Sequence, residues 1–214
     1  MKNTALYKAP VEHISDLLHA YQYYQHNGNV PENLRNIYEF TGHLHFTNRR
    51  STELQFQMNE IANHLHNQLC RSLLGNSYRK LQKQRFQPMI ICFFDQEGSR
   101  EGVSTDKCEF PHIHGLCVIH PHTDDDFYKL TEPSSGNRFR LKQAISGFRD
   151  ITFKPTENDT NGIMRFTDYC LKSDKIKSHS GNNIFTYGVY PKNNKWTVYL
   201  NEISEKDLRK HNYH

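Results

Sequence analysis

Apolar residues recur at two different spacings along the chain, and these spacings separate expected helices from expected strands. Positions three or four apart mark one face of a helix over residues 52–74: Leu54, Met58, Ile61, Leu65 and Leu69. Thr52 and Gln55 match a capping box at its start, and Gly75 suits its end. Similar but weaker patterns predict a helical N-terminal extension over residues 1–37 and helices over 139–148 and 163–173.

Short runs of aromatic and β-branched residues predict the strands. They lie at 38–48, 86–97, 112–120 and 150–155, with two further strand-like runs at 183–190 and 195–203. The segments 121–127 and 131–137 are interpreted as surface loops.

The order of these elements indicates an α+β fold. We expect an antiparallel sheet of about five strands in a βαββαβ arrangement, similar to RRM and ferredoxin-like domains, with the helices on one face. The other face would then hold a substrate. The main domain is expected over 38–178, and residues 179–214 are expected to form a C-terminal extension that packs on it.

Composition narrows the class of protein. The chain has 214 residues with 13 Phe and 12 Tyr, which argues against disorder. No apolar run approaches the roughly 20 residues of a membrane helix, and the first residues lack the apolar core of a signal peptide. We therefore expect a cytoplasmic protein without a membrane partner. The five cysteines contain no CxxC pair, so we expect buried thiols rather than disulfides or a cysteine zinc site.

Positive charge is modest in total but clustered. The net charge is +4, and residues 78–85 alone hold four cations. Further clusters are Arg49-Arg50, Arg138–Arg140–Lys142 and Lys172–Lys175–Lys177. Any one cluster is typical of a solvated face. Together, and interleaved with aromatic residues, they suit contact with a phosphate backbone.

A pair of histidines offers the first candidate chemistry. His112 and His114 are two apart on an expected strand, so both face the same side and can share a divalent cation. Asp95 and Glu97 end the preceding strand, its expected hairpin neighbour, and either carboxylate would complete a His-His-acid set. Such a set accepts Mn²⁺ or Mg²⁺ and leaves positions for a phosphate oxygen. With 14 histidines in the chain, an H-x-H pair also arises by chance.

A tyrosine and a lysine offer the second candidate chemistry. Tyr169 and Lys172 are three apart on an expected helix and therefore share a face. None of the other eleven tyrosines has a lysine at this spacing. A tyrosine nucleophile needs a phosphate near its phenol, and an ammonium group nearby helps to neutralise that phosphate.

Three motifs in order carry a resemblance to a known family. They are "HLHFTN" at 43–48, "PHIHG" at 111–115 and "YCLK" at 169–172. In this order the chain resembles the HUH endonucleases, in particular the Rep branch that initiates rolling-circle replication with one catalytic tyrosine. The acidic ligand of small circular-DNA virus Reps lies just before the first glycine of "DQEGSREG", which favours Glu97 over Asp95.

The resemblance implies a metal-dependent, site-specific endonuclease and strand transferase that acts on single-stranded DNA at an origin or hairpin. His112, His114 and Glu97 would bind the metal. Tyr169 would attack the phosphate, leaving a 5′-phosphotyrosine and a 3′-OH, while Lys172 positions the phosphate. A host or phage replication helicase is an expected partner. DNA contacts are expected from residues along the first strand and after the helix: His43, His45, Thr47, Asn48, Arg49, Arg50 and Lys175. For His43 and His45, an added metal ligand or simple pairing with solvent are the alternatives to a place in the DNA groove.

The chain also departs from the family, and other functions remain open. Some plasmid Reps have a glutamate four residues before the tyrosine, where this chain has Arg165, and no second tyrosine lies one turn away. A single-tyrosine HUH transposase would share the same chemistry. A non-catalytic DNA-binding regulator is the alternative from another class. The H-x-T pattern of two-histidine phosphoesterases occurs at His45–Thr47 but is not repeated at His112 or His114.

Overall fold

The computed structural model describes residues 5–28, 36–45, 51–95, 112–156, 160–171, 187–192 and 196. The helices in these ranges are α1 (Ala5–Gln25), α2 (Ser51–Leu74), α3 (Leu81–Gln84), α4 (Asp124–Lys129) and α5 (Thr160–Cys170), with a 3₁₀ turn η1 (Pro121–Thr123). The strands are β1 (Ile37–Leu44), β2 (Met89–Asp95), β3 (His112–Val118), β4 (Thr131–Ser134), β5 (Arg138–Leu141), β6 (Phe148–Pro155) and β7 (Tyr187–Tyr190).

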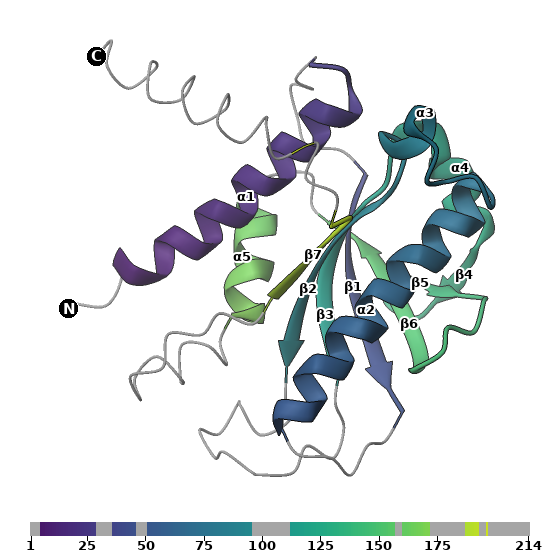
Figure 1. Ribbon diagram of the computed structural model, residues 1–214. Helices are drawn as coiled ribbons and strands as arrows, with labels where there is room; N and C mark the ends of the chain where they lie inside the picture. The colour runs from purple at the N-terminus through teal and green to yellow at the C-terminus, as the bar shows by residue number, and fades with distance from the viewer. Residues whose placement is uncertain are drawn as a thin grey trace.

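These strands form one antiparallel sheet in the order β4-β5-β6-β1-β3-β2-β7 (Figure 1). The α+β class and the antiparallel sheet are therefore confirmed, as is the pairing of β2 with β3. The expected number of about five strands is wrong, because seven lie in the described residues.

Helices cover both faces of the sheet, which corrects the expectation that they lie on one. α2 packs on one face, against side chains such as Phe40, Ile90 and Cys117. α1 and α5 pack on the other, against side chains such as Ile91 and Leu116 (Figure 1). The physical reason is visible in β2, whose buried residues 89–93 are consecutive. A strand that is apolar on both faces needs cover on both.

The cover on the α1 and α5 face stops partway across the sheet. Over much of β2 and β3 that face is apolar and buried, and Tyr187 and Val189 of β7 are partly buried beside it. Over β1 and β6 it carries polar, partly exposed residues in three cross-strand pairs: Glu39 with Lys154, Thr41 with Thr152, and His43 with Asp150. One half of this face is thus packed against helices, and the other half is polar and open to a ligand.

Two segments differ from their expected structure. Residues 139–148, expected as a helix, form the end of β5, a turn and the start of β6. β4, from a region expected to be loop, forms a hairpin with β5, and the turn between them contains Gly136 and Asn137, both with positive φ. The cause is the turn chemistry at residues 135–137, because glycine and asparagine adopt the left-handed region at low cost. Residues 121–127 likewise contain η1 and the start of α4 rather than loop alone.

Several other expectations agree with the structure. The helix expected over 52–74 is α2, and the helical start of the chain is α1. The four cysteines in the described residues are buried thiols: Cys70, Cys92, Cys117 and Cys170. The strand expected at 195–203 lies outside the described residues, except for Trp196, which is buried. Within the part of the chain that is described, no helix has the length and apolar character needed to cross a bilayer.

Candidate active site

The registers of three neighbouring strands bring the candidate residues into two rows across one face of the sheet. In one row, Asp95 of β2 pairs with His112 of β3, and His112 pairs with His43 of β1. In the next row, His114 of β3 pairs with Thr41 of β1. Because cross-strand partners face the same side, the backbone alone places His112 beside His43 and His114 beside Thr41 on one face.

The two histidines of β3 lie close enough to bind one ion together. Their ring centroids are 4.7 Å apart at an interplanar angle of 84°. The hydroxyl oxygen Oγ1 of Thr41 lies 3.1 Å from Nδ1 of His114, within hydrogen-bond distance. A partner at Nδ1 fixes the ring orientation and leaves Nε2 as the nitrogen for a metal, as in many metal-binding histidines.

Tyr169 reaches the same place from α5. Its ring lies 5.7 Å from that of His114, centroid to centroid, and meets it at 73°. The helix is held by buried residues on its other side, among them Ile163 and Cys170, which belong to the core shared with α1. Phe166, one turn before Tyr169, also faces His114, with ring centroids 6.4 Å apart. The packing of α5 therefore directs two aromatic rings at the histidine pair.

His43 is held by a carboxylate on the next strand. Its Nδ1 donates a hydrogen bond to Oδ1 of Asp150 at 2.7 Å, and Nε of Arg149 lies 3.3 Å from Oδ2 of the same carboxylate. Burial raises the pKa of Asp150, but the hydrogen bonds and charges of His43 and Arg149 outweigh burial and lower it. The ring centroids of His43 and His112 are 6.4 Å apart. The strand that carries His43, β1, flanks β3 on the side opposite β2.

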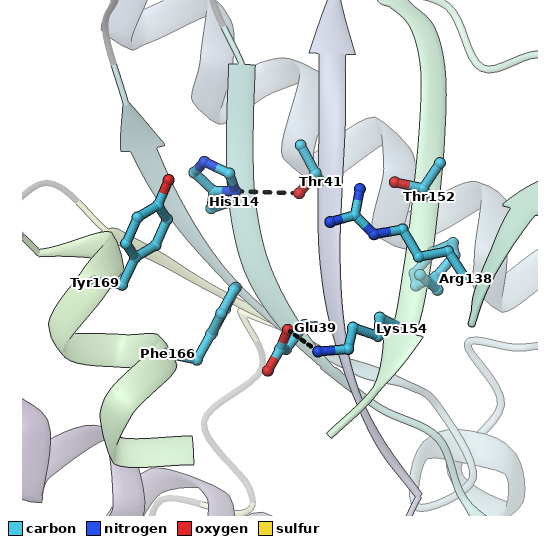
Figure 2. Close-up of a pocket in the computed structure, with 9 residues that line it drawn as sticks. Glu39, Thr41, His114, Arg138, Thr152, Lys154, Phe166 and Tyr169 are labelled. Carbon is cyan, nitrogen blue, oxygen red and sulfur yellow. Dashed lines mark hydrogen bonds and ion pairs between the residues drawn. The ribbon is translucent and has the colours of Figure 1, made fainter. Parts of the chain in front are cut away.

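A groove of about 310 Å³ opens beside Tyr169 and His114 (Figure 2). Phe166 and Tyr169 of α5 form one wall, and Arg138 of β5 and Lys154 of β6 form the other. The floor is polar and comes from the open half of the sheet: Glu39, Thr41 and Thr152. Nζ of Lys154 lies 3.9 Å from Oε2 of Glu39.

The residues present fit a divalent cation in part. The rings of His112 and His114 lie beside each other, and the Thr41 hydroxyl lies within hydrogen-bond distance of Nδ1 of His114, as second-sphere partners of metal-binding histidines do. Among the described residues there is no group of three His, Cys, Asp or Glu side chains placed to hold a metal. The expected third ligand, Glu97, lies outside them, and for Asp95 only the backbone is described.

Six other predicted site residues also lie outside the residues that the structure describes. These are Lys172, Thr47, Asn48, Arg49, Arg50 and Lys175. His45 is described at the end of β1, where it is exposed and its N–H donates to the carbonyl of Gly147 at 3.1 Å.

Sequence reasoning missed most of the groove, although a signal for it was present. Polar residues alternate along β1 at Glu39, Thr41 and His43, and along β6 at Asp150, Thr152 and Lys154. A period of two marks one face of a strand. The alternation identifies these residues as one open surface only when the two strands are known to be neighbours.

Comparison of the chain with protein-family models, with curated proteins and with solved structures gives no match.

Proposed function

We propose that the protein is a metal-dependent, site-specific endonuclease and strand transferase for single-stranded DNA, of the replication-initiator type. The observation that carries the proposal is the contact between the Tyr169 ring and the His114 ring, 5.7 Å apart. A potential nucleophile from a helix and one histidine of a potential ligand pair from a strand line the same groove. That combination is what phosphodiester transesterification requires.

Tyr169 acts as the nucleophile in this proposal. Its phenol oxygen forms a bond to phosphorus as the bond between phosphorus and the 3′-oxygen breaks. The phenol loses its proton, and the 3′-oxygen leaves with the electron pair and gains one. The products are a 5′-phosphotyrosine and a free 3′-OH. One phosphate ester bond replaces another, so the same residues support the reverse reaction and join strands.

His112 and His114 hold the divalent cation, Mn²⁺ or Mg²⁺, with a carboxylate from position 95 or 97 as the third ligand. The cation, when bound, stabilises negative charge on the phosphate. Thr41 keeps the His114 ring in the orientation that suits binding through Nε2. Lys172, close to Tyr169 in sequence, adds a positive charge for the phosphate.

The open half of the sheet receives the strand. Arg138 of the neighbouring strand β5 offers a cation for the backbone, and Phe166 of α5 offers its ring for stacking against a base. Proteins that bind single strands combine these two features, because a phosphate backbone is anionic and every base has an aromatic face.

The test is a search for the covalent intermediate. The full-length protein is incubated with Mn²⁺ and a pool of randomised single-stranded DNA, and a band shifted on a denaturing gel is expected. Tyr169→Phe abolishes this band while DNA binding persists. Tyr128→Phe, which changes an exposed tyrosine on α4, is the control and retains the band.

Two results would contradict the proposal. An adduct that survives in Tyr169→Phe means that another residue is the nucleophile. Binding without any adduct in the unaltered protein, with Mn²⁺ or Mg²⁺, favours the non-catalytic regulator. The sequences recovered from the adduct also separate the replication initiator from a transposase, because the latter selects the hairpin ends of a mobile element.

A further inference from the structure

The floor of the groove contains a carboxylate, which is an unexpected group beside a DNA backbone. Glu39 lies between Leu116 of β3 and Lys154 of β6 in the sheet register, and 23% of its side chain is exposed. A carboxylate repels phosphate but accepts hydrogen bonds from the N–H groups of a base. A groove that bound only the backbone would gain nothing from Glu39.

Glu39 forms an ion pair with Lys154 beside the groove. The two charged atoms are 3.9 Å apart, and 47% of the Lys154 side chain is exposed. Exposed ion pairs at this distance contribute little to stability. The pair does, however, set a carboxylate and an ammonium side by side at one edge of the groove (Figure 2).

We propose that this groove binds one guanine of the single strand, with Glu39 and Lys154 reading its Watson–Crick edge. The inference rests on the proposed function and names the base that its site selects. Guanine presents two adjacent donors, N1–H and N2–H, which match the two carboxylate oxygens, and its O6 accepts from the ammonium of Lys154. Adenine and cytosine present one amino group beside an acceptor, and thymine presents one N–H between two carbonyls. Guanine alone offers a donor to each carboxylate oxygen and, beside them, an acceptor to the ammonium.

The aromatic wall fixes where the guanine lies along the strand. Phe166 lies one helical turn from Tyr169, and both rings line the groove. Figure 2 shows Phe166 pointing into the groove near Glu39, while Lys154 reaches Glu39 from the opposite side. A base stacked on Phe166 is therefore within about two nucleotides of the phosphate that faces Tyr169.

The first experiment reads base preference from binding, so it does not depend on cleavage. Single-stranded DNA bound by full-length Tyr169→Phe is selected from a randomised pool and sequenced. Guanine is expected to be enriched at one position. Adding Glu39→Gln reduces that enrichment at least tenfold, because the amide loses one acceptor and gains a donor that opposes N2–H. Glu132→Gln, which changes an exposed acid on β4, leaves the enrichment as it was.

The second experiment replaces the selected guanine with inosine, which lacks the N2 amino group. Tyr169→Phe is expected to lose about tenfold in affinity for the inosine strand, and Tyr169→Phe with Glu39→Gln to lose much less. The inference is overturned if no position selects guanine, or if Glu39→Gln keeps the guanine preference. Neither result bears on the covalent adduct, so the proposed function is tested separately by the adduct experiment.

Discussion

The ring of Tyr169 meets the ring of His114 edge-on, with their centroids 5.7 Å apart. This contact requires the helix that carries the tyrosine and the strand that carries the histidines to face each other. A sheet with all its helices on one face and its histidines on the other would keep the two rings apart. The cover of α1 and α5 on the histidine face is thus a condition for the proposed chemistry and not a detail of the fold.

The Thr41 hydroxyl is expected to control metal affinity. Thr41→Val keeps the shape of the side chain but removes the partner of His114 Nδ1. Loss of such a partner typically lowers metal affinity about 10- to 100-fold. Titration calorimetry with Mn²⁺ measures the change. Thr152→Val, directly across from Thr41 on β6, is the matched control and should change the affinity little. Equal losses in both variants would argue against a specific role for Thr41.

The third metal ligand is predicted to be Asp95 rather than Glu97. The register pairs the backbone of Asp95 with that of His112, whereas the family resemblance favours Glu97. An amide is a poorer metal ligand than a carboxylate. Asp95→Asn is therefore expected to weaken Mn²⁺ binding at least tenfold. Glu97→Gln is expected to weaken it less. Calorimetry on the two variants decides between them. The reverse ranking would show that the ligand lies beyond the last pair of the β2–β3 ladder.

The sequence predicts those parts of the site that lie within one strand or one hairpin. The side shared by His112 and His114 follows from a period of two, and the pairing of β2 with β3 follows from their adjacency in the chain. The tyrosine helix is also predicted, from a weaker apolar spacing over 163–173. Each of these is a local property that a short stretch of residues decides.

The remaining parts depend on strand order, which local patterns do not determine. β6 lies beside β1, so Asp150 meets His43 and Thr152 meets Thr41 across a large separation in sequence. Residues 139–148 contain Phe139, Leu141 and Ile145, whose spacing suits a helix as well as a strand and turn. Pairing of β5 with β4, across the turn at Gly136 and Asn137, and with β6 settles that ambiguity.

The glycine that follows the second histidine is expected to be required for packing. A Cβ added at Gly115 would overlap the ring of Phe40 and the carbonyl oxygen of Ile91. Gly115→Ala should lower the free energy of unfolding by about 2 kcal/mol, within the range for overpacked cores. Urea denaturation measures this. Combining it with Phe40→Leu, which shortens the obstructing ring, should cost less than the two single changes added together. Strict additivity would mean that Phe40 is not the obstacle.

Stability is expected to fall with acid because of His66 on α2. Its Nε2 lies 3.1 Å from the carbonyl oxygen of Pro88. Burial lowers the pKa of His66 from 6.5 to about 4, although the bond to Pro88 opposes the shift. Between these two values the unfolded chain binds a proton that the folded chain does not. The free energy of unfolding therefore decreases as the pH falls below 6.5, and this contribution levels off near 4.

Two urea denaturation series measure the effect, one at pH 7.5 and one at pH 5. The unaltered protein should lose about 2 kcal/mol through His66 between these conditions. His66→Phe keeps an aromatic ring against Tyr190, which stacks on His66 with ring centroids 6.2 Å apart, and removes the titrating group. Between the two pH values, the free energy of unfolding of this variant should fall by about 2 kcal/mol less than that of the unaltered protein. Some dependence remains in the variant, because burial also lowers the pKa of His120 to about 4. If His66→Phe loses as much stability between the two pH values as the unaltered protein does, His66 already binds a proton in the folded state at pH 5.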